Sequence, residues 1–149
     1  MTIGSNPTIR VLAVDDSPTV RSVVILAFTG APGYAVRVEA DSMLGLRESE
    51  RASADGKPYD CFLLDIEMEP FDGFELARRL RVRPAYARTP IIFLTSSEDP
   101  ALRDRAAVFG AGFLAKSSIT VLRASLREVV DEWTRPSKPP PAGGEWGRR

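Results

Sequence analysis

Two short apolar runs of this sequence end in acidic residues. Asp15 and Asp16 end the run 8–16, and Asp65 ends the run 59–65. A pair of carboxylates that faces a third one suits a hard cation such as Mg²⁺, which binds oxygen ligands and is usually completed by water and by a substrate phosphate. Asp65 could then act as a carboxylate nucleophile that forms an aspartyl phosphate, while the metal balances the charge on the phosphoryl oxygens.

Two more apolar runs end in polar residues that fit the same chemistry. Thr95 lies at the end of the run 89–96, and Lys116 closes the run 111–116. Each of these residues alone would be explained most simply as a polar group at the point where a strand meets solvent. Their joint occurrence favours a shared site, in which the ammonium group of Lys116 and a metal ion would together compensate a phosphoryl group.

The segments that must position these residues alternate in pattern. The expected strands are residues 8–16, 34–40, 59–65, 89–96 and 111–116, and the expected helices are residues 17–30, 41–56, 72–83, 99–110 and 117–135. The alternation predicts one α/β domain, a doubly wound five-stranded parallel sheet with helices on both faces. In such a sheet ligands bind beyond the carboxyl ends of the strands, where the polar residues lie.

The last expected helix has an apolar stripe that would face this sheet. Its members are Leu122, Leu126, Val129 and Trp133, which recur at helical spacing.

Composition limits the classes of function. The chain has 149 residues, 44% of them apolar, which predicts a single domain, and its 20 Lys and Arg balance its 20 Asp and Glu. No apolar stretch reaches the roughly 18 residues of a membrane span and no signal peptide is evident, so we expect a cytoplasmic protein without membrane insertion. Cys61, the single cysteine, is expected to be buried, and the lack of histidine excludes imidazole bases and histidine metal ligands.

Four segments together resemble response-regulator receiver domains of the CheY-like chemotaxis type, which have the flavodoxin-like fold. They are VDDSPTVR, LLDIEMEPFDGFEL, FLTSS and GAGFLAKSS, and the resemblance covers residues 8 to about 134. It implies a phosphoryl acceptor at Asp65, metal-binding acids at Asp15 and Asp16, a switch hydroxyl at Thr95, a phosphate-reading lysine at Lys116 and a switch aromatic at Phe113. The output would then be a changed surface on the fourth helix, fifth strand and fifth helix.

Three positions depart from the usual family pattern. Glu69 and Pro70 follow Met68 where a proline and a glycine are usual, and Ser117 replaces the proline that usually follows the lysine. A cis bond before Ser117 would cost about 2.5–4 kcal/mol. Glu67, the third departure, could repel a phosphodonor or orient water, while its backbone carbonyl could still serve the metal.

The resemblance implies a single-domain response regulator, a signalling phosphoacceptor with at most slow self-dephosphorylation rather than an enzyme. A histidine kinase or phosphotransfer protein would be the donor, and an output protein such as a flagellar motor component would be the partner. A degenerate receiver operated by nucleotide binding alone is the alternative. A haloacid-dehalogenase-type enzyme fits poorly because its DxD motif is lacking, and DNA binding is not expected because no helix-turn-helix would fit.

The chain divides into an expected receiver domain, residues 1–135, and a tail, residues 136–149, rich in Pro, Gly and Arg. Such a composition favours disorder. A weaker resemblance, to arginine-rich CheY-like regulators that bind cyclic di-GMP, suggests a nucleotide site, since arginine forks grip phosphates and tryptophan offers a stacking platform. The candidate residues are Trp133, Arg135, Trp146, Arg148 and Arg149.

Overall fold

The computed structural model describes residues 8–135, and residues 1–7 and 136–149 lie outside that description. The strands are β1 (Ile9–Val14), β2 (Tyr34–Glu39), β3 (Cys61–Asp65), β4 (Ile91–Thr95) and β5 (Gly112–Ala115). The helices are α1 (Pro18–Phe28), α2 (Ser42–Ala54), α3 (Gly73–Arg81), α4 (Pro100–Val108) and α5 (Ile119–Thr134). A short 3₁₀ helix, η1 (Pro84–Tyr86), precedes β4 and was not expected from the sequence.

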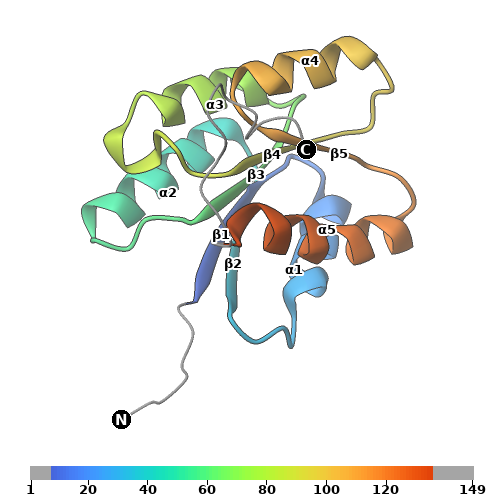
Figure 1. Cartoon of the computed structure of the whole chain (residues 1–149), viewed down its shortest axis with the longest axis horizontal. Coiled ribbons are helices and arrows are strands. Elements are labelled where there is room, and N and C mark those ends of the chain that lie inside the picture. Colours follow the sequence, from blue (N-terminus) through green and yellow to red (C-terminus); the bar gives the residue numbers. More distant parts are fainter. Residues whose placement is uncertain (1–7, 136–149) are drawn as a thin grey trace.

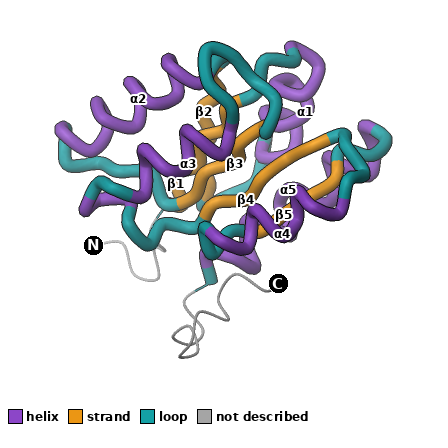
Figure 2. Tube along the Cα trace, turned by 90° about the horizontal axis from the view of Figure 1, so that it is seen from above, coloured by secondary structure: helices purple, strands orange, loops and turns teal. Residues whose placement is uncertain are grey.

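The five strands form one parallel sheet in the order β2-β1-β3-β4-β5. Helices α1 and α5 cover one face of the sheet, and α2, α3 and α4 cover the other (Figure 1). Figure 2 shows the strands, in orange, lying side by side among the helices. The predicted doubly wound, flavodoxin-like fold is therefore confirmed.

Each inner strand supplies apolar side chains to both faces. On β3, Phe62 and Leu64 pack under α2, α3 and α4, whereas Cys61 and Leu63 pack under α1 and α5. This alternation follows from the two-residue period of a strand, and it explains why the strands read as continuous apolar runs. Cys61 is fully buried, as predicted.

The predicted stripe on α5 requires one correction. Leu122, Leu126 and Trp133 are buried, but the residue that completes the stripe is Val130, which is 0% exposed. Val129 is only partly buried beside it. Among the described residues, no helix is both long and apolar enough to cross a membrane.

All five helices begin at the carboxyl edge of the sheet with a capping side chain. The caps are Ser17, Asp41, Asp72, Asp99 and Ser118, each of which accepts a hydrogen bond from a backbone N–H of the first turn. Capping satisfies a donor that the helix itself leaves unpaired. The edge that carries the polar strand ends therefore also gathers five helix N-termini, whose partial positive charge favours anions.

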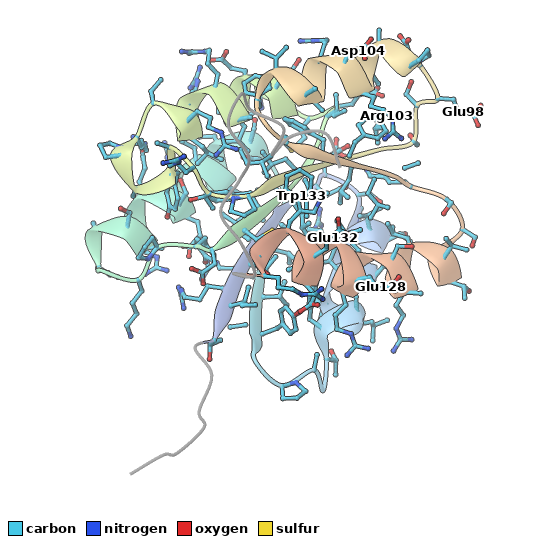
Figure 3. All side chains as sticks on the ribbon, in the orientation of Figure 1. Glu98, Arg103, Asp104, Glu128, Glu132 and Trp133 are labelled. Atoms are coloured by element: carbon cyan, nitrogen blue, oxygen red, sulfur yellow. The ribbon has the colours of Figure 1, made fainter. Side chains whose placement is uncertain are left out.

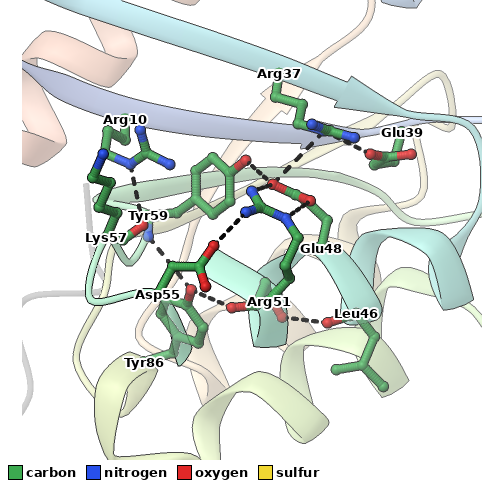
Figure 4. A network of polar contacts seen from close by, with 11 residues as sticks. Arg10, Arg37, Glu39, Leu46, Glu48, Arg51, Asp55, Lys57, Tyr59 and Tyr86 are labelled. Carbon is green, nitrogen blue, oxygen red and sulfur yellow. Dashed lines mark hydrogen bonds and ion pairs between the residues drawn. The ribbon is translucent and has the colours of Figure 1, made fainter. Parts of the chain in front are cut away.

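A buried carboxylate ties α2 to the sheet and to the loop before β3 (Figure 4). Glu48 accepts hydrogen bonds from Arg51 at 2.6 Å and from the hydroxyl group of Tyr59 at 2.5 Å. The hydroxyl of Tyr86 donates to the carbonyl oxygen of Ser49 at 2.7 Å. The bond from Arg51 lowers the pKa of Glu48 to about 2, against the effect of burial.

Glu48→Gln is expected to lower the free energy of unfolding by about 2 kcal/mol at pH 7, because it removes the buried charge that pairs with Arg51. The pKa of Glu48 in the folded protein lies below its ordinary value of 4.5, so its charge stabilises the fold above that pH, and this stabilisation is lost as pH falls towards 2. Urea unfolding should show a smaller difference in the free energy of unfolding between wild type and Glu48→Gln at pH 3 than at pH 7. Asp55→Asn, which removes the exposed partner of the same arginine, should cost less than about 0.5 kcal/mol; an equal loss in both variants would contradict the prediction.

Candidate functional site

Three carboxylates meet at the carboxyl edge of the sheet, between β1 and β3. The order of strands reverses at this point, because β2 lies on one side of β1 and β3 lies on the other. Asp15 follows β1 and is 1% exposed, and Asp65 ends β3 and is 4% exposed. Together with the exposed Asp16, they each offer an oxygen within 4.8 Å of the others. The sequence prediction that these acids converge is confirmed.

Lys116 bridges the two buried acids. Its Nζ lies 2.8 Å from Oδ2 of Asp15 and 3.0 Å from Oδ1 of Asp65. The residue follows β5 directly, and its backbone N–H donates to the carbonyl oxygen of Thr95 at 2.7 Å, which fixes where the side chain starts. A single ammonium group therefore pairs with two of the three carboxylates.

The acidic cluster is chemically suited to a metal ion. Oδ1 of Asp15 accepts a hydrogen bond from the backbone N–H of Ser17 at 2.9 Å. Oδ2 of Asp15 lies near Lys116 but accepts no well-directed hydrogen bond within the described part of the chain. The three carboxylates of Asp15, Asp16 and Asp65 are oxygen ligands of the kind that a hard divalent cation would bind.

Electrostatics within the cluster disfavour the charged form of the central acid. Burial, and then the neighbouring charge of Asp15, raise the pKa of Asp65 to about 6, although Lys116 opposes the shift. Burial lowers the pKa of Lys116, but its pairs with Asp15 and Asp65 outweigh that effect and raise the pKa. A bound cation would reduce the repulsion that raises the pKa of Asp65.

The loop after Asp65 is held from two sides, by residues that sequence reasoning did not single out. The backbone N–H of Gly73 donates to the carbonyl oxygen of Ile66 at 2.8 Å. A Cβ atom on Gly73 would lie 2.1 Å from the carbonyl oxygen of Asp65, so only glycine fits there. On the other side, the fully buried Ser42 binds the loop at Glu69 and Phe71. The Asp72-Gly73 pair, a common turn signal, is the one hint that the sequence offers.

Thr95 and Phe113 lie on neighbouring strands. Thr95 is 1% exposed, and its Oγ1 accepts a hydrogen bond from the backbone N–H of Ser97 at 3.0 Å. Phe113 is partly buried against the cluster under α2, α3 and α4, and the guanidinium carbon of Arg103 lies 4.7 Å from the centre of its ring. The role of Phe113 as a switch aromatic stays a prediction.

A pocket of about 530 Å³ opens beside the acidic cluster. Asp16 and Glu67 lie in its wall, together with Asp72, which caps α3, and with residues of α4 and of the loop that leads into it. Glu67 is exposed, and its side chain is not among the three carboxylates that converge. Within residues 8–135 the one cis peptide bond is Glu69–Pro70, so the bond between Lys116 and Ser117 is trans.

The predicted nucleotide-binding residues do not form a site within the described residues. Trp133, labelled on α5 in Figure 3, is 4% exposed. Its ring lies about 3 Å from where a Cβ of Gly112 would stand, so it packs against β5 and cannot serve as a stacking platform. Arg135 pairs with Asp131 at 2.5 Å. Trp146, Arg148 and Arg149 lie outside the described residues.

Comparison with known proteins shows a family match and relatives of similar sequence. Residues 11–127 match the response regulator receiver domain family. A gliding motility regulatory protein of Myxococcus xanthus is 36% identical over 127 residues, which cover 85% of this chain and 15% of that protein. The transcriptional regulatory protein TcrA of Mycobacterium tuberculosis is 30% identical over 141 residues, 92% of this chain and 52% of that protein. The chain thus spans about half or less of the length of these relatives.

Solved structures agree with the sequence comparison. The chemotaxis response regulator CheY4 of Vibrio cholerae superposes with a TM-score of 0.69 at 31% identity, covering 82% of this chain and 98% of that one. The receiver domain of a Pseudomonas aeruginosa sensor histidine kinase, solved with magnesium coordinated in its active site cleft, gives 0.71 at 28% identity, covering 85% and 98%. With the family match over most of its length, this chain belongs to the response regulator receiver domain family.

Proposed function

We propose that Asp65 accepts a phosphoryl group from a histidine kinase or a phosphotransfer protein, with Mg²⁺ held by Asp15, Asp16, Asp65 and the backbone carbonyl of Glu67. The observation that carries the proposal is the position of Lys116, whose Nζ lies 2.8 Å and 3.0 Å from the two buried acids. A purely structural ion pair would need only one carboxylate, whereas here a second buried carboxylate contacts the same ammonium group.

The residues of the site have distinct tasks in this reaction. One carboxylate oxygen of Asp65 attacks phosphorus, and the donor departs with the electron pair of the broken bond. Lys116, which now contacts Oδ1 of Asp65, remains within reach of a phosphoryl oxygen attached to that residue. The hydroxyl of Thr95 already accepts from Ser97, so its proton is left to donate. The bound metal would supply the remaining compensation of negative charge.

The output would be a change in the surface formed by α4, β5 and α5, where Thr95 and Phe113 connect to the site. The domain would comprise residues 1–135 and signal by binding a partner, such as a flagellar motor component. The phosphorylated state would end by hydrolysis of the acyl phosphate, without further enzymatic activity. A degenerate receiver is less well supported, because every polar residue that the chemistry needs lies at the same edge of the sheet.

Cyclic di-GMP binding receives no support from the described residues. Trp133 packs against β5, and Arg135 is engaged with Asp131. The remaining candidates, Trp146, Arg148 and Arg149, belong to residues 136–149, which the structure does not describe. A tail that binds nucleotide through these three residues stays a prediction of the sequence alone.

Intact-mass spectrometry tests the phosphoacceptor function. Incubation with phosphoramidate and Mg²⁺ is expected to add one phosphoryl group, which hydroxylamine removes because acyl phosphates are labile to it. Chelation of the metal with EDTA should prevent the addition, and beryllium fluoride with Mg²⁺ should bind in competition with it. Folded protein that keeps its original mass after long exposure to donor and Mg²⁺ would refute the proposal in favour of a degenerate receiver.

A further inference from the structure

Arg81, the last residue of α3, lies among backbone carbonyl oxygens at the carboxyl-terminal end of α4. Its Nε and Nη2 donate to the carbonyl oxygen of Phe109, the C-cap of α4, at 3.3 Å and 3.1 Å. Its Nη1 donates to the carbonyl oxygens of Tyr86 and Thr89 at 3.0 Å and 2.6 Å. One side chain thus joins the end of α3, the end of α4 and the segment that leads into β4.

No carboxylate of residues 8–135 forms an ion pair with this guanidinium group. Burial lowers the pKa of Arg81, yet an arginine side chain stays charged at neutral pH. The last carbonyl groups of a helix have no partner within it and carry its negative partial charge. Arg81 therefore satisfies the end of α4 with a full positive charge in a planar, forked geometry.

Side-chain packing holds the same end of α4. The ring of Phe109 stacks on that of Phe74 with centroids 6.0 Å apart, and it meets the ring of Phe93 edge-on at 5.9 Å. The backbone N–H groups of Phe109 and Ala111 both donate to the carbonyl oxygen of the buried Ala106. The last turn of α4 is therefore held by a charge, by aromatic contacts and by buried backbone hydrogen bonds.

The amino-terminal end of α4 is exposed and its hydrogen bonds are local. Pro100 and Ala101 are exposed, and Asp99 caps the helix by accepting from Ala101 at 3.0 Å. The Oγ of Ser97 accepts from the backbone N–H of Asp99 at 3.2 Å, and the backbone N–H of Ser97 donates to Oγ1 of Thr95 at 3.0 Å. The first turn of α4 is therefore tied chiefly to the loop that follows Thr95.

The middle of α4 contacts its neighbours through two arginine side chains that lie over aromatic rings. Arg103, which lies between α4 and β5 in Figure 3, has its guanidinium carbon 4.7 Å from the centre of the Phe113 ring. The guanidinium carbon of Arg105 lies 4.0 Å from the centre of the Phe74 ring on α3. A cation is attracted to a ring face as a whole rather than to one atom, so these two contacts allow α4 to shift.

We infer, on the basis of the phosphorylation proposed above, that α4 turns about its carboxyl-terminal end when the site is occupied. Arg81 is the positioning residue that holds this end in place. The first turn of α4 follows the loop after Thr95, whose hydroxyl group reorients toward the phosphoryl group, while the last turn stays where it is. The change of surface is therefore largest at residues 97–103 and vanishes near Phe109.

Amide hydrogen exchange measured by NMR on the full chain tests this gradient. Beryllium fluoride with Mg²⁺ serves as the analogue of the phosphoryl group, and fluorine NMR shows that it has bound. In the wild type, beryllium fluoride added to the protein with Mg²⁺ is expected to change the exchange rates at residues 97–103 about threefold or more. The rates of the Phe109 and Ala111 amides should change by less than about 1.5-fold. An equal change along the whole of α4 would overturn the turning motion.

Arg81→Lys tests the anchor. Lysine keeps the charge, but its one nitrogen atom cannot span the three carbonyl groups that the nitrogen atoms of arginine reach. With Mg²⁺ alone, the amides of Phe109 and Ala111 should exchange about tenfold faster than in the wild type. Beryllium fluoride should now change their rates about threefold or more, because the last turn of α4 moves with the first.

Arg78→Lys is the matched control, since Arg78 is an exposed arginine of the same helix that pairs with Glu75. It should keep the wild-type gradient. If Arg81→Lys does not fold, Arg81→Gln replaces it, because its neutral amide donates to at most two carbonyl groups. A wild-type gradient in the folded Arg81 variant would overturn the role of Arg81 and leave phosphorylation intact. Lack of both phosphoryl uptake and beryllium fluoride binding in the wild type would instead refute the phosphoacceptor function, and the turning motion with it.

Discussion

Asp65→Asn is expected to abolish phosphoryl uptake and, at the same time, to stabilise the metal-free protein. The amide lacks the nucleophilic carboxylate, so no acyl phosphate can form. The same change removes a charge that burial and Asp15 disfavour, as the raised pKa of about 6 records. Since one pKa unit corresponds to about 1.4 kcal/mol, the gain at pH 7.5 should be on the order of 1–3 kcal/mol.

The stability gain has a definite dependence on pH. The pKa of Asp65 in the folded protein lies above its ordinary value of 3.8, so the folded state binds more protons than the unfolded state between that value and about pH 6. Wild-type stability therefore falls as pH rises through this window, and the penalty is complete above it. The melting temperatures of the two proteins should differ most at pH 7.5 and converge near pH 4.

A measurement with Mg²⁺ and a surface variant separate the effect of removing the Asp65 charge from other effects of the substitution. Mg²⁺ should raise the melting temperature of the wild type more than that of Asp65→Asn, because it relieves the repulsion that the variant lacks. Asp104→Asn, the same substitution at an exposed position, should leave the melting temperature within about one degree of the wild type. A variant less stable than the wild type at pH 7.5 would show that the pairing of Asp65 with Lys116 outweighs the cost of its charge.

Among alanine substitutions of the described glycines, Gly73→Ala is expected to cause the largest loss of stability. The new Cβ would stand 2.1 Å from the carbonyl oxygen of Asp65 and 3.0 Å from Cα of Ile66. Both atoms belong to the backbone, so the loop and the start of α3 must move apart. We expect a loss of about 3–5 kcal/mol in the free energy of unfolding, together with at least a tenfold weaker affinity for Mg²⁺.

Urea denaturation and a Mg²⁺ titration measure the two effects of Gly73→Ala. Pro100→Ala is the matched control, since it also places alanine at the first position of a helix, but at an exposed site at the start of α4. The control should change stability by less than about 1 kcal/mol and should keep the affinity for Mg²⁺. Similar small losses in both variants would mean that the loop adjusts to the added methyl group at little cost.

The sequence determined the fold and the position of the chemistry. Five apolar runs that alternate with helical segments admit few arrangements other than a parallel sheet covered on both faces. In that arrangement the carboxyl ends of all five strands lie at one edge of the sheet. Asp15, Asp65, Thr95 and Lys116 stand at the ends of their runs, so they lie together at that edge. Local pattern carries this information because strand direction is common to all five strands, so no long-range distance has to be known.

Only the tertiary structure decided which side chains are available and what holds them. In the sequence, Trp133 fits both the apolar stripe of the last helix and the cationic, aromatic segment that follows it. In the structure its ring packs against Gly112, so the residue belongs to the core. Ser42 and Glu48 look like ordinary polar positions of a helix, yet both are buried with partners up to 29 residues away. The near contact of Gly73 with Asp65 is likewise set by how α3 meets β3. Sequence period shows which face a residue occupies, but not which distant atoms pack against that face.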